Sequence, residues 1–138
     1  MSIPIELATL AERIEEFGAV AYLVTVGAEG EPHIVSVQVR WEGAALVVGA
    51  GRRTSANVER APRVTLLWPA RPGGGYSLIL DGRAAPGPSA PGATPGPSAP
   101  GATSGGPTLA IEPSAAVLHR TPEGDPSAPS CITVLAAR

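Results

Sequence analysis

The sequence predicts a mainly β protein: an antiparallel β-barrel with an N-terminal helix and a short helix after the third strand. Short apolar runs rich in β-branched residues recur along the first 84 positions. Several of the connections between them have hairpin length, which implies antiparallel pairing and favours a barrel over a doubly wound sheet. The length of 138 residues fits one domain, and 43% hydrophobic residues suffice for a core.

The first predicted element is an amphipathic helix over residues 5–17. Its apolar side chains recur at helical spacing, at Leu7, Leu10, Ile14 and Phe17. Gly18 is placed to end the helix. Four glutamates in the first 16 residues argue against a signal peptide. No apolar run approaches the ~20 residues that a membrane helix needs, so we expect a cytoplasmic protein without a membrane partner.

The remaining predicted elements follow in order. They are strands over 20–26, 35–40 and 44–49, a helix over 54–60, and strands over 64–68, 76–84, 108–119 and 132–136. Val35, Val37 and Val39 alternate with polar residues, as in a strand with one buried face. Pro62 ends the second helix, and Pro113 interrupts the strand over 108–119. Trp41 and Trp68 are expected in the core or an interface, and Asp81 in a turn or bulge before Gly82.

The stretch 86–107 differs in kind from the rest of the chain. Thirteen of its 22 residues are Pro or Gly, and the nine residues 86–94 are repeated unchanged at 95–103. No large apolar side chain is present to offset the entropy of ordering. We therefore predict one domain over 1–138 that carries a disordered insert at 86–107.

Composition excludes several function classes. The net charge is −2 and all ten basic residues are arginines, so no concentrated basic face for nucleic acid is expected. The single cysteine, Cys131, forms neither an intrachain disulfide nor a zinc site, and we expect it to be buried. No metal site is predicted.

The segment 49–57 is the most informative candidate site. It joins a strand to a helix through a Gly-rich turn that carries Arg52, Arg53, Thr54 and Ser55. Free backbone N–H groups at a helix start, arginine forks and hydroxyl donors suit a phosphate monoester. The alternative is that Thr54 or Ser55 is only an N-cap and the arginines are solvated. The segment is also a near miss to a dinucleotide-binding fingerprint, which lacks its third glycine here.

Six runs of residues carry a family resemblance. They are Ala21–Val26, Glu29–His33, Leu46–Gly49, Arg52–Asn57, Ala61–Trp68 and Asp81–Ala84, with a weaker continuation at Ala116–Arg120. In this order they resemble the pyridoxamine 5′-phosphate oxidase-like, FMN-binding split-barrel superfamily. The tryptophan-rich C-terminus of true pyridoxamine phosphate oxidases is missing, so their substrate is not expected.

The resemblance implies an FMN-binding oxidoreductase that is a homodimer with flavin at its interface. It places the phosphate on Arg52, Arg53, Thr54 and Ser55, with Thr54 standing where relatives often have lysine. It places the isoalloxazine edge near Ser36, Val37, Gln38 and Val48, and brings Ser77 from the partner. No catalytic acid or base is evident, and the small-molecule substrate is left open. The alternatives are the deazaflavin F420, heme with His119 as ligand, or a cofactor-free binding or scaffolding dimer.

Overall fold

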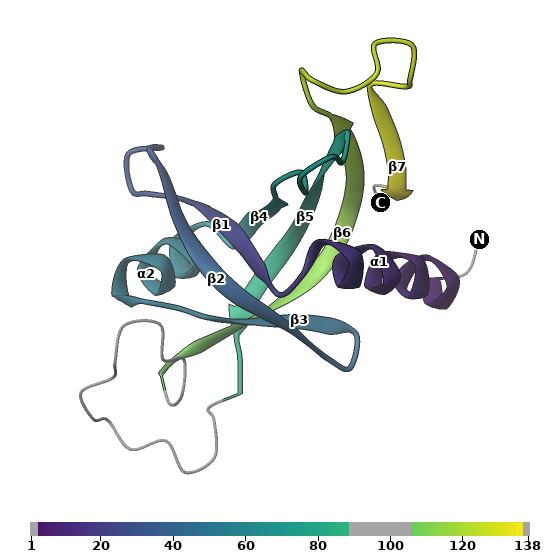
Figure 1. Ribbon diagram of the computed structural model, residues 1–138. Helices are drawn as coiled ribbons and strands as arrows, with labels where there is room; N and C mark the ends of the chain where they lie inside the picture. The colour runs from purple at the N-terminus through teal and green to yellow at the C-terminus, as the bar shows by residue number, and fades with distance from the viewer. Residues whose placement is uncertain (1–2, 89–105, 137–138) are drawn as a thin grey trace.

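The computed structural model describes residues 3–88 and 106–136, with side chains from residue 8 onward. Within these residues, two helices and seven strands follow one another along the chain (Figure 1): α1 (Ile3–Phe17), β1 (Val20–Val26), β2 (Pro32–Glu42), β3 (Ala45–Gly49), α2 (Arg52–Arg60), β4 (Arg63–Trp68), β5 (Tyr76–Pro86), β6 (Thr108–Arg120) and β7 (Cys131–Leu135). The sheet order is β3-β2-β1-β4-β5-β6-β7, and a further β3–β6 pairing closes the first six strands into a barrel. Every pairing is antiparallel, which confirms the predicted fold class.

The core lies inside the barrel, where alternate side chains of each strand meet. Along β1 the buried residues alternate with exposed or half-buried ones, as the pleat of a strand requires. Trp68 is fully buried and its Nε1 donates to the carbonyl of Gly18 at 3.0 Å, which confirms a core position. Trp41 is half-buried against the same core cluster.

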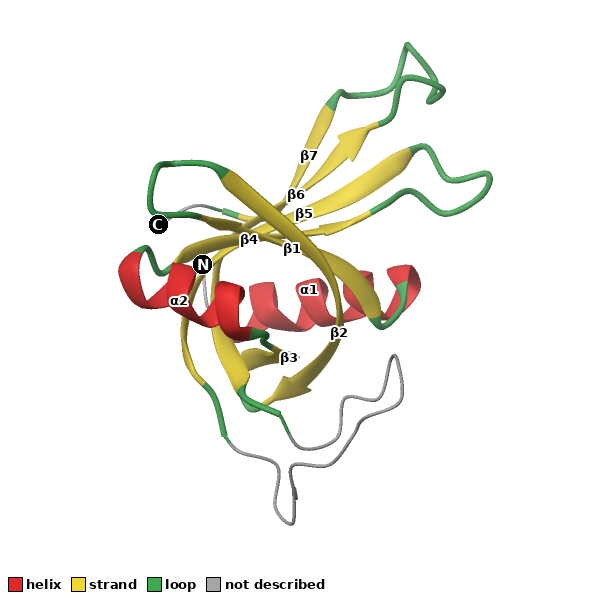
Figure 2. Cartoon of the chain, turned by 90° about the vertical axis from the view of Figure 1, so that its left-hand side faces the viewer, coloured by secondary structure: helices red, strands yellow, loops and turns green. Residues whose placement is uncertain are grey.

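Helix α1 buries one face and ends where the sequence predicts. Leu10 and Ile14 are buried and Phe17 is half-buried, while the side chain of Leu7 lies outside the described residues. Gly18 ends the helix with φ +99°, a conformation that favours glycine, and its N–H donates to the carbonyl of Ile14 at 2.9 Å. In the view of Figure 2, α1 runs beside the strands, and it contacts β5 and β7.

The long strands β5 and β6 pair along most of their length despite a proline. The register shifts between Asp81 and Gly82, and Pro113 pairs with Gly82 at this point. A bulge leaves a ladder position without a partner, so the missing N–H of proline is tolerated there. Strand β6 is therefore continuous, whereas an interruption was expected. The expected bulge at Asp81 is confirmed.

The predicted disordered insert lies mostly outside the described residues, but both of its ends are described. Pro86 pairs with Leu109, and the N–H of Gly87 donates to the carbonyl of Thr108 at 2.8 Å. The chain therefore leaves and re-enters the barrel at neighbouring positions of two paired strands.

The prediction that Cys131 is buried is wrong. Cys131 is exposed, because it begins β7, which lies at the edge of the sheet beyond β6. A strand in this place has neighbours on one side alone, so its first residues are not covered. Among the described helices, none is long and apolar enough to cross a membrane.

Candidate functional site

Helix α2 begins earlier than predicted, and this changes the roles of the residues at its start. Its N-cap is Gly51, with no side-chain cap, and the first helical bond runs from the N–H of Ser55 to the carbonyl of Gly51 at 2.9 Å. Neither Thr54 nor Ser55 is the N-cap. The N–H groups of Arg52, Arg53 and Thr54 precede that first bond, so they point out of the helix end with a partial positive charge.

The four predicted phosphate ligands differ in accessibility. Arg52 and Arg53 are exposed, Ser55 is half-buried, and Thr54 is 2% exposed. The described part of the chain contains two ion pairs, Arg13–Glu16 and Arg40–Glu42, so neither guanidinium of the turn is paired. An added Cβ at Gly51 would meet no atom of a described residue within 4 Å, so the cap position itself is not crowded by them. The turn therefore presents three amide donors and two exposed guanidinium groups, neither of which forms an ion pair with a described residue.

A buried hydrogen bond that sequence reasoning missed attaches α2 to the barrel. The Nδ2 of Asn57 donates to the Oγ1 of Thr25 on β1 at 3.0 Å. The guanidinium of Arg60 donates to the Oδ1 of Asn57 at 3.2 Å. Thr25 and Asn57 lie 32 positions apart, and no local pattern in the sequence links them.

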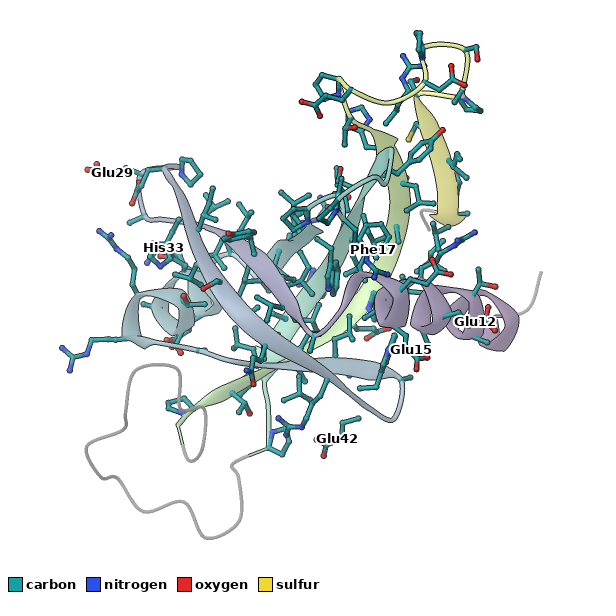
Figure 3. The ribbon with its side chains drawn as sticks, viewed as in Figure 1. Glu12, Glu15, Phe17, Glu29, His33 and Glu42 are labelled. Carbon is teal, nitrogen blue, oxygen red and sulfur yellow. The ribbon has the colours of Figure 1, made fainter. Side chains whose placement is uncertain are left out.

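The turn between β1 and β2 brings a fixed negative charge near α2. The carboxylate of Glu31 accepts from the N–H of Glu29 at 2.9 Å. Hydrogen bonding to its own backbone N–H, then to that of Glu29, and the charges of Arg53 and Arg60 lower the pKa of the Glu31 carboxyl. In Figure 3, Glu29 and His33 lie in and beside this turn, above α2. The positive charge of Arg53 is thus partly balanced within the chain.

Strand β2 has a free edge beside the start of α2. The N–H of Val39 donates to the carbonyl of Ala19 at 2.7 Å, so the odd-numbered residues of β2 bond to β1. The backbone groups of Ser36 and Gln38 therefore point to the opposite edge. In the described residues, β3 pairs with residues 39–42 of β2, which leaves Ser36 without a strand on that side.

The four residues predicted to lie near the isoalloxazine ring differ in whether their side chains are exposed or buried. The side chains of Ser36 and Gln38 are exposed, and the backbone groups of Ser36 face the edge of β2 that no described strand covers. The side chains of Val37 and Val48 face the core and are buried. Val48 also pairs with Val39 on one side and Leu109 on the other. The two valines can therefore shape this edge but offer no side chain to a ligand.

The structure does not bring Ser77 to the turn. Ser77 lies on β5, which β1 and β4 separate from β2. Its Oγ donates to the carbonyl of His119 at 3.4 Å, and His119 is exposed beside it on β6. The Nδ1 of His119 lies 3.0 Å from the carbonyl of Ser130, so in the neutral imidazole Nδ1 carries the proton and Nε2 the lone pair. A contact of Ser77 with a ligand on the turn would require a second copy of the chain.

Clustered acid–base or metal-binding groups are not part of this site. In residues 3–88 and 106–136, no three His, Cys, Asp or Glu side chains form a group that could hold a metal ion. What the arrangement offers is a helix start with three amide donors and the guanidinium groups of Arg52 and Arg53, together with the free backbone groups of Ser36 on β2. It is suited to holding a ligand that has both a phosphate and a planar polar part.

No family model matches the chain, but two individual proteins are similar to it over most of its length. An uncharacterized protein of Mycobacterium bovis, Mb0449c, is 32% identical over 140 residues, covering 93% of this chain and 90% of the relative. MT0457 of Mycobacterium tuberculosis matches with the same identity and coverage.

Solved structures share the fold. A Clostridium acetobutylicum protein of the pyridoxinephosphate oxidase family superposes with a TM-score of 0.63 at 14% identity, covering 93% of this chain and 94% of that one. A heme binding protein from Mycobacterium smegmatis gives 0.57 at 16% identity, covering 93% and 58%. An F420 reductase gives 0.52 at 17% identity, covering 71% and 88%. At these identities the likeness shows the fold alone.

The closed antiparallel barrel and the likeness to these solved structures indicate the same fold. The chain belongs to the same family as the two mycobacterial proteins, and it shares its split-barrel fold with a protein of the pyridoxinephosphate oxidase family.

Proposed function

We propose that the protein is an FMN-dependent oxidoreductase that holds its flavin at the interface of a homodimer and acts on a small-molecule substrate. The observation that carries this proposal is the start of α2, where two exposed guanidinium groups without ion-pair partners in the described residues flank three free amide donors. Charge-assisted bonds of this kind suit a phosphate. A flavin without a phosphate would leave these donors unused.

The residues present fit the two ends of FMN. Arg52, Arg53 and the first amides of α2 would hold the phosphate, and Ser55 adds a half-buried hydroxyl. The free backbone groups of Ser36, with the exposed side chains of Ser36 and Gln38, would hold the polar edge of the ring. When bound, FMN supplies hydride transfer, and the protein contributes binding and orientation.

An exposed apolar face supports the dimer. Large apolar side chains are exposed on the outer side of the β1–β2 pair, with Ile34 59% and Val20 55% exposed. Tyr22 lies on the same face, directly opposite Ser36. Contiguous exposed apolar surface on a small domain indicates an interface. In the proposed dimer, the partner on this face supplies its Ser77 to the ligand beside Ser36 and Gln38.

Two measurements test the proposal. Titration of purified protein with FMN and with riboflavin should show tighter binding of FMN, because riboflavin lacks the phosphate. Light scattering at micromolar concentration with flavin bound should report a dimer. A protein that stays colourless after FMN is added, or that remains monomeric with flavin bound, contradicts the proposal.

Heme is the second candidate, because the free Nε2 of the exposed His119 is a possible axial ligand. The fold is shared with a heme binding protein from Mycobacterium smegmatis. The absorption spectrum separates the candidates: heme gives a Soret band, oxidised flavin two visible bands, and F420 a single blue-violet band. A Soret band that disappears in His119→Ala would establish heme and displace FMN.

A further inference from the structure

Helix α2 has little apolar surface with which to fix its own position. It is nine residues long, and its buried residues are Thr54, Asn57 and Val58. A helix this short does not persist without tertiary contacts. Val58 is the sole aliphatic residue among the three, so apolar packing alone sets the direction of the helix loosely.

The side chain of Asn57 supplies the directional contact. Both ends of its amide are used, since Nδ2 donates to Thr25 and Oδ1 accepts from Arg60. The two contacts also assign the amide orientation. Thr25 is buried on β1, a strand that is paired with β2 on one side and β4 on the other. It is therefore a fixed point on the barrel.

We propose that Asn57 and Thr25 are positioning residues that set the selectivity of the site for the phosphorylated form of its ligand. This inference rests on the proposed function. Asn57 lies four residues after Arg53, which is about 6 Å along a helix axis. Loss of its bond to Thr25 frees the helix to tilt about Val58, and the tilt displaces the amides and guanidinium groups of the first turn. Displacements of about 1 Å are enough to weaken such contacts.

The ring end of the ligand is unaffected by this tilt, because Ser36 and Gln38 lie on β2 and not on α2. The two ends of the ligand thus depend on different parts of the fold. A weakened Asn57–Thr25 contact lowers affinity for FMN and leaves affinity for riboflavin unchanged. A loss of general stability would instead weaken both ligands together.

The experiment compares Thr25→Val, which removes the hydroxyl at nearly constant shape, with Thr25→Ser, which keeps it. Dissociation constants for FMN and riboflavin are measured by flavin fluorescence, and melting temperatures by circular dichroism. Thr65→Val is the matched control, because it removes a threonine hydroxyl bond, to Asp81 at 2.7 Å, from β4 instead of β1. Asn57→Leu removes the other partner.

We expect the preference for FMN over riboflavin to fall about tenfold in Thr25→Val and Asn57→Leu, the size of one charge-assisted bond. Thr25→Ser and Thr65→Val should keep the wild-type preference. An unchanged preference in folded Thr25→Val overturns the inference and leaves the proposed function standing. A wild-type protein that binds riboflavin as tightly as FMN overturns the phosphate site and this inference with it. Should Asn57→Leu not fold, the threonine pair decides.

Discussion

The two helices are attached to the barrel by different means. Helix α1 buries Leu10 and Ile14, with Leu10 0% exposed, against the core. Helix α2 contributes Val58 and a hydrogen bond from Asn57 to Thr25. Apolar burial is strong but without direction, whereas a hydrogen bond is sensitive to angle and distance. Helix α1 therefore contributes mainly to stability, whereas the hydrogen bond of Asn57 sets the orientation of α2 and of the residues in its first turn.

The largest expected effect comes from α1. Leu10→Ala removes a fully buried side chain and should lower the free energy of unfolding by about 2–5 kcal/mol, the range for such truncations. Chemical denaturation measures it, and exposed Glu12→Ala is the control, with an expected change within about 0.5 kcal/mol. The preference for FMN over riboflavin should not change in Leu10→Ala. A changed preference would mean that α1 also acts on the ligand site.

The next effect concerns binding and comes from α2. Arg53→Ala should weaken FMN binding by about 1.5–3 kcal/mol, or about 10- to 150-fold, because a charge-assisted contact is lost. The melting temperature should stay unchanged, since Arg53 is exposed and has no ion pair with a described residue. Arg52→Ala should have a smaller effect. Unchanged FMN affinity in a titration of Arg53→Ala would move the phosphate elsewhere.

A smaller effect of opposite sign is expected at the β1–β2 turn. Glu31→Gln removes a negative charge near Arg53 and should strengthen FMN binding about two- to fivefold at low salt, the size of an exposed charge interaction. Riboflavin binding should not respond. Glu29→Gln, on the same turn, is the control. Equal gains in both variants would indicate a general effect of net charge.

The same carboxyl contributes a pH dependence of stability. Its pKa is lowered in the folded protein, so its contribution is present above the ordinary value of 4.5 and is lost as the pH falls through the lowered value. Glu31→Gln should therefore lose less stability than the wild type on acidification below about pH 4.5. Thermal melts of both proteins between neutral pH and pH 3 measure the difference. Parallel decreases would show that other carboxyl groups dominate.

The smallest effect is expected from the repeat. Deletion of residues 86–94 places the identical second copy, which begins at Pro95, directly after Ala85. A proline then stands again at the end of β5, where it can pair with Leu109 as Pro86 does. Each doubling of loop length costs about 0.6 kcal/mol. Melting temperature and FMN affinity should both stay nearly unchanged. A decrease of several degrees, or a tenfold loss of affinity, would give the repeat a role in the site.

Much of the fold could be predicted from the sequence, because its elements follow local rules. Alternation of valines with polar residues predicted β2, and Gly18 predicted the end of α1. The interruption predicted at Pro113 was wrong, because β6 accommodates the proline through a shift of its register against β5, which leaves Ser114 without a paired residue. The predicted burial of Cys131 was also wrong, because its exposure follows from the position of β7 at the edge of the sheet and not from the type of residue.

The candidate site was less predictable. The exposed arginines could be proposed from their place after a Gly-rich turn, but α2 starts at Arg52 with Gly51 as its N-cap, although the nearby Ser55 is the better capping residue. Because α2 starts at Arg52, Thr54 lies in the helix and its side chain is buried. The contact between Asn57 and Thr25 carries no local signal, because tertiary structure alone brings them together.

The backbone hydrogen bond between Gly87 and Thr108 has a consequence for protein engineering. The backbone bond between them, and the bond from the Oγ1 of Thr108 to the carbonyl of Pro88 at 2.5 Å, join the two ends of the insert to each other. The two ends of the insert that the structure describes therefore lie side by side at one place on the barrel. An affinity tag or a whole foreign domain with neighbouring termini can be grafted there without separating β5 from β6.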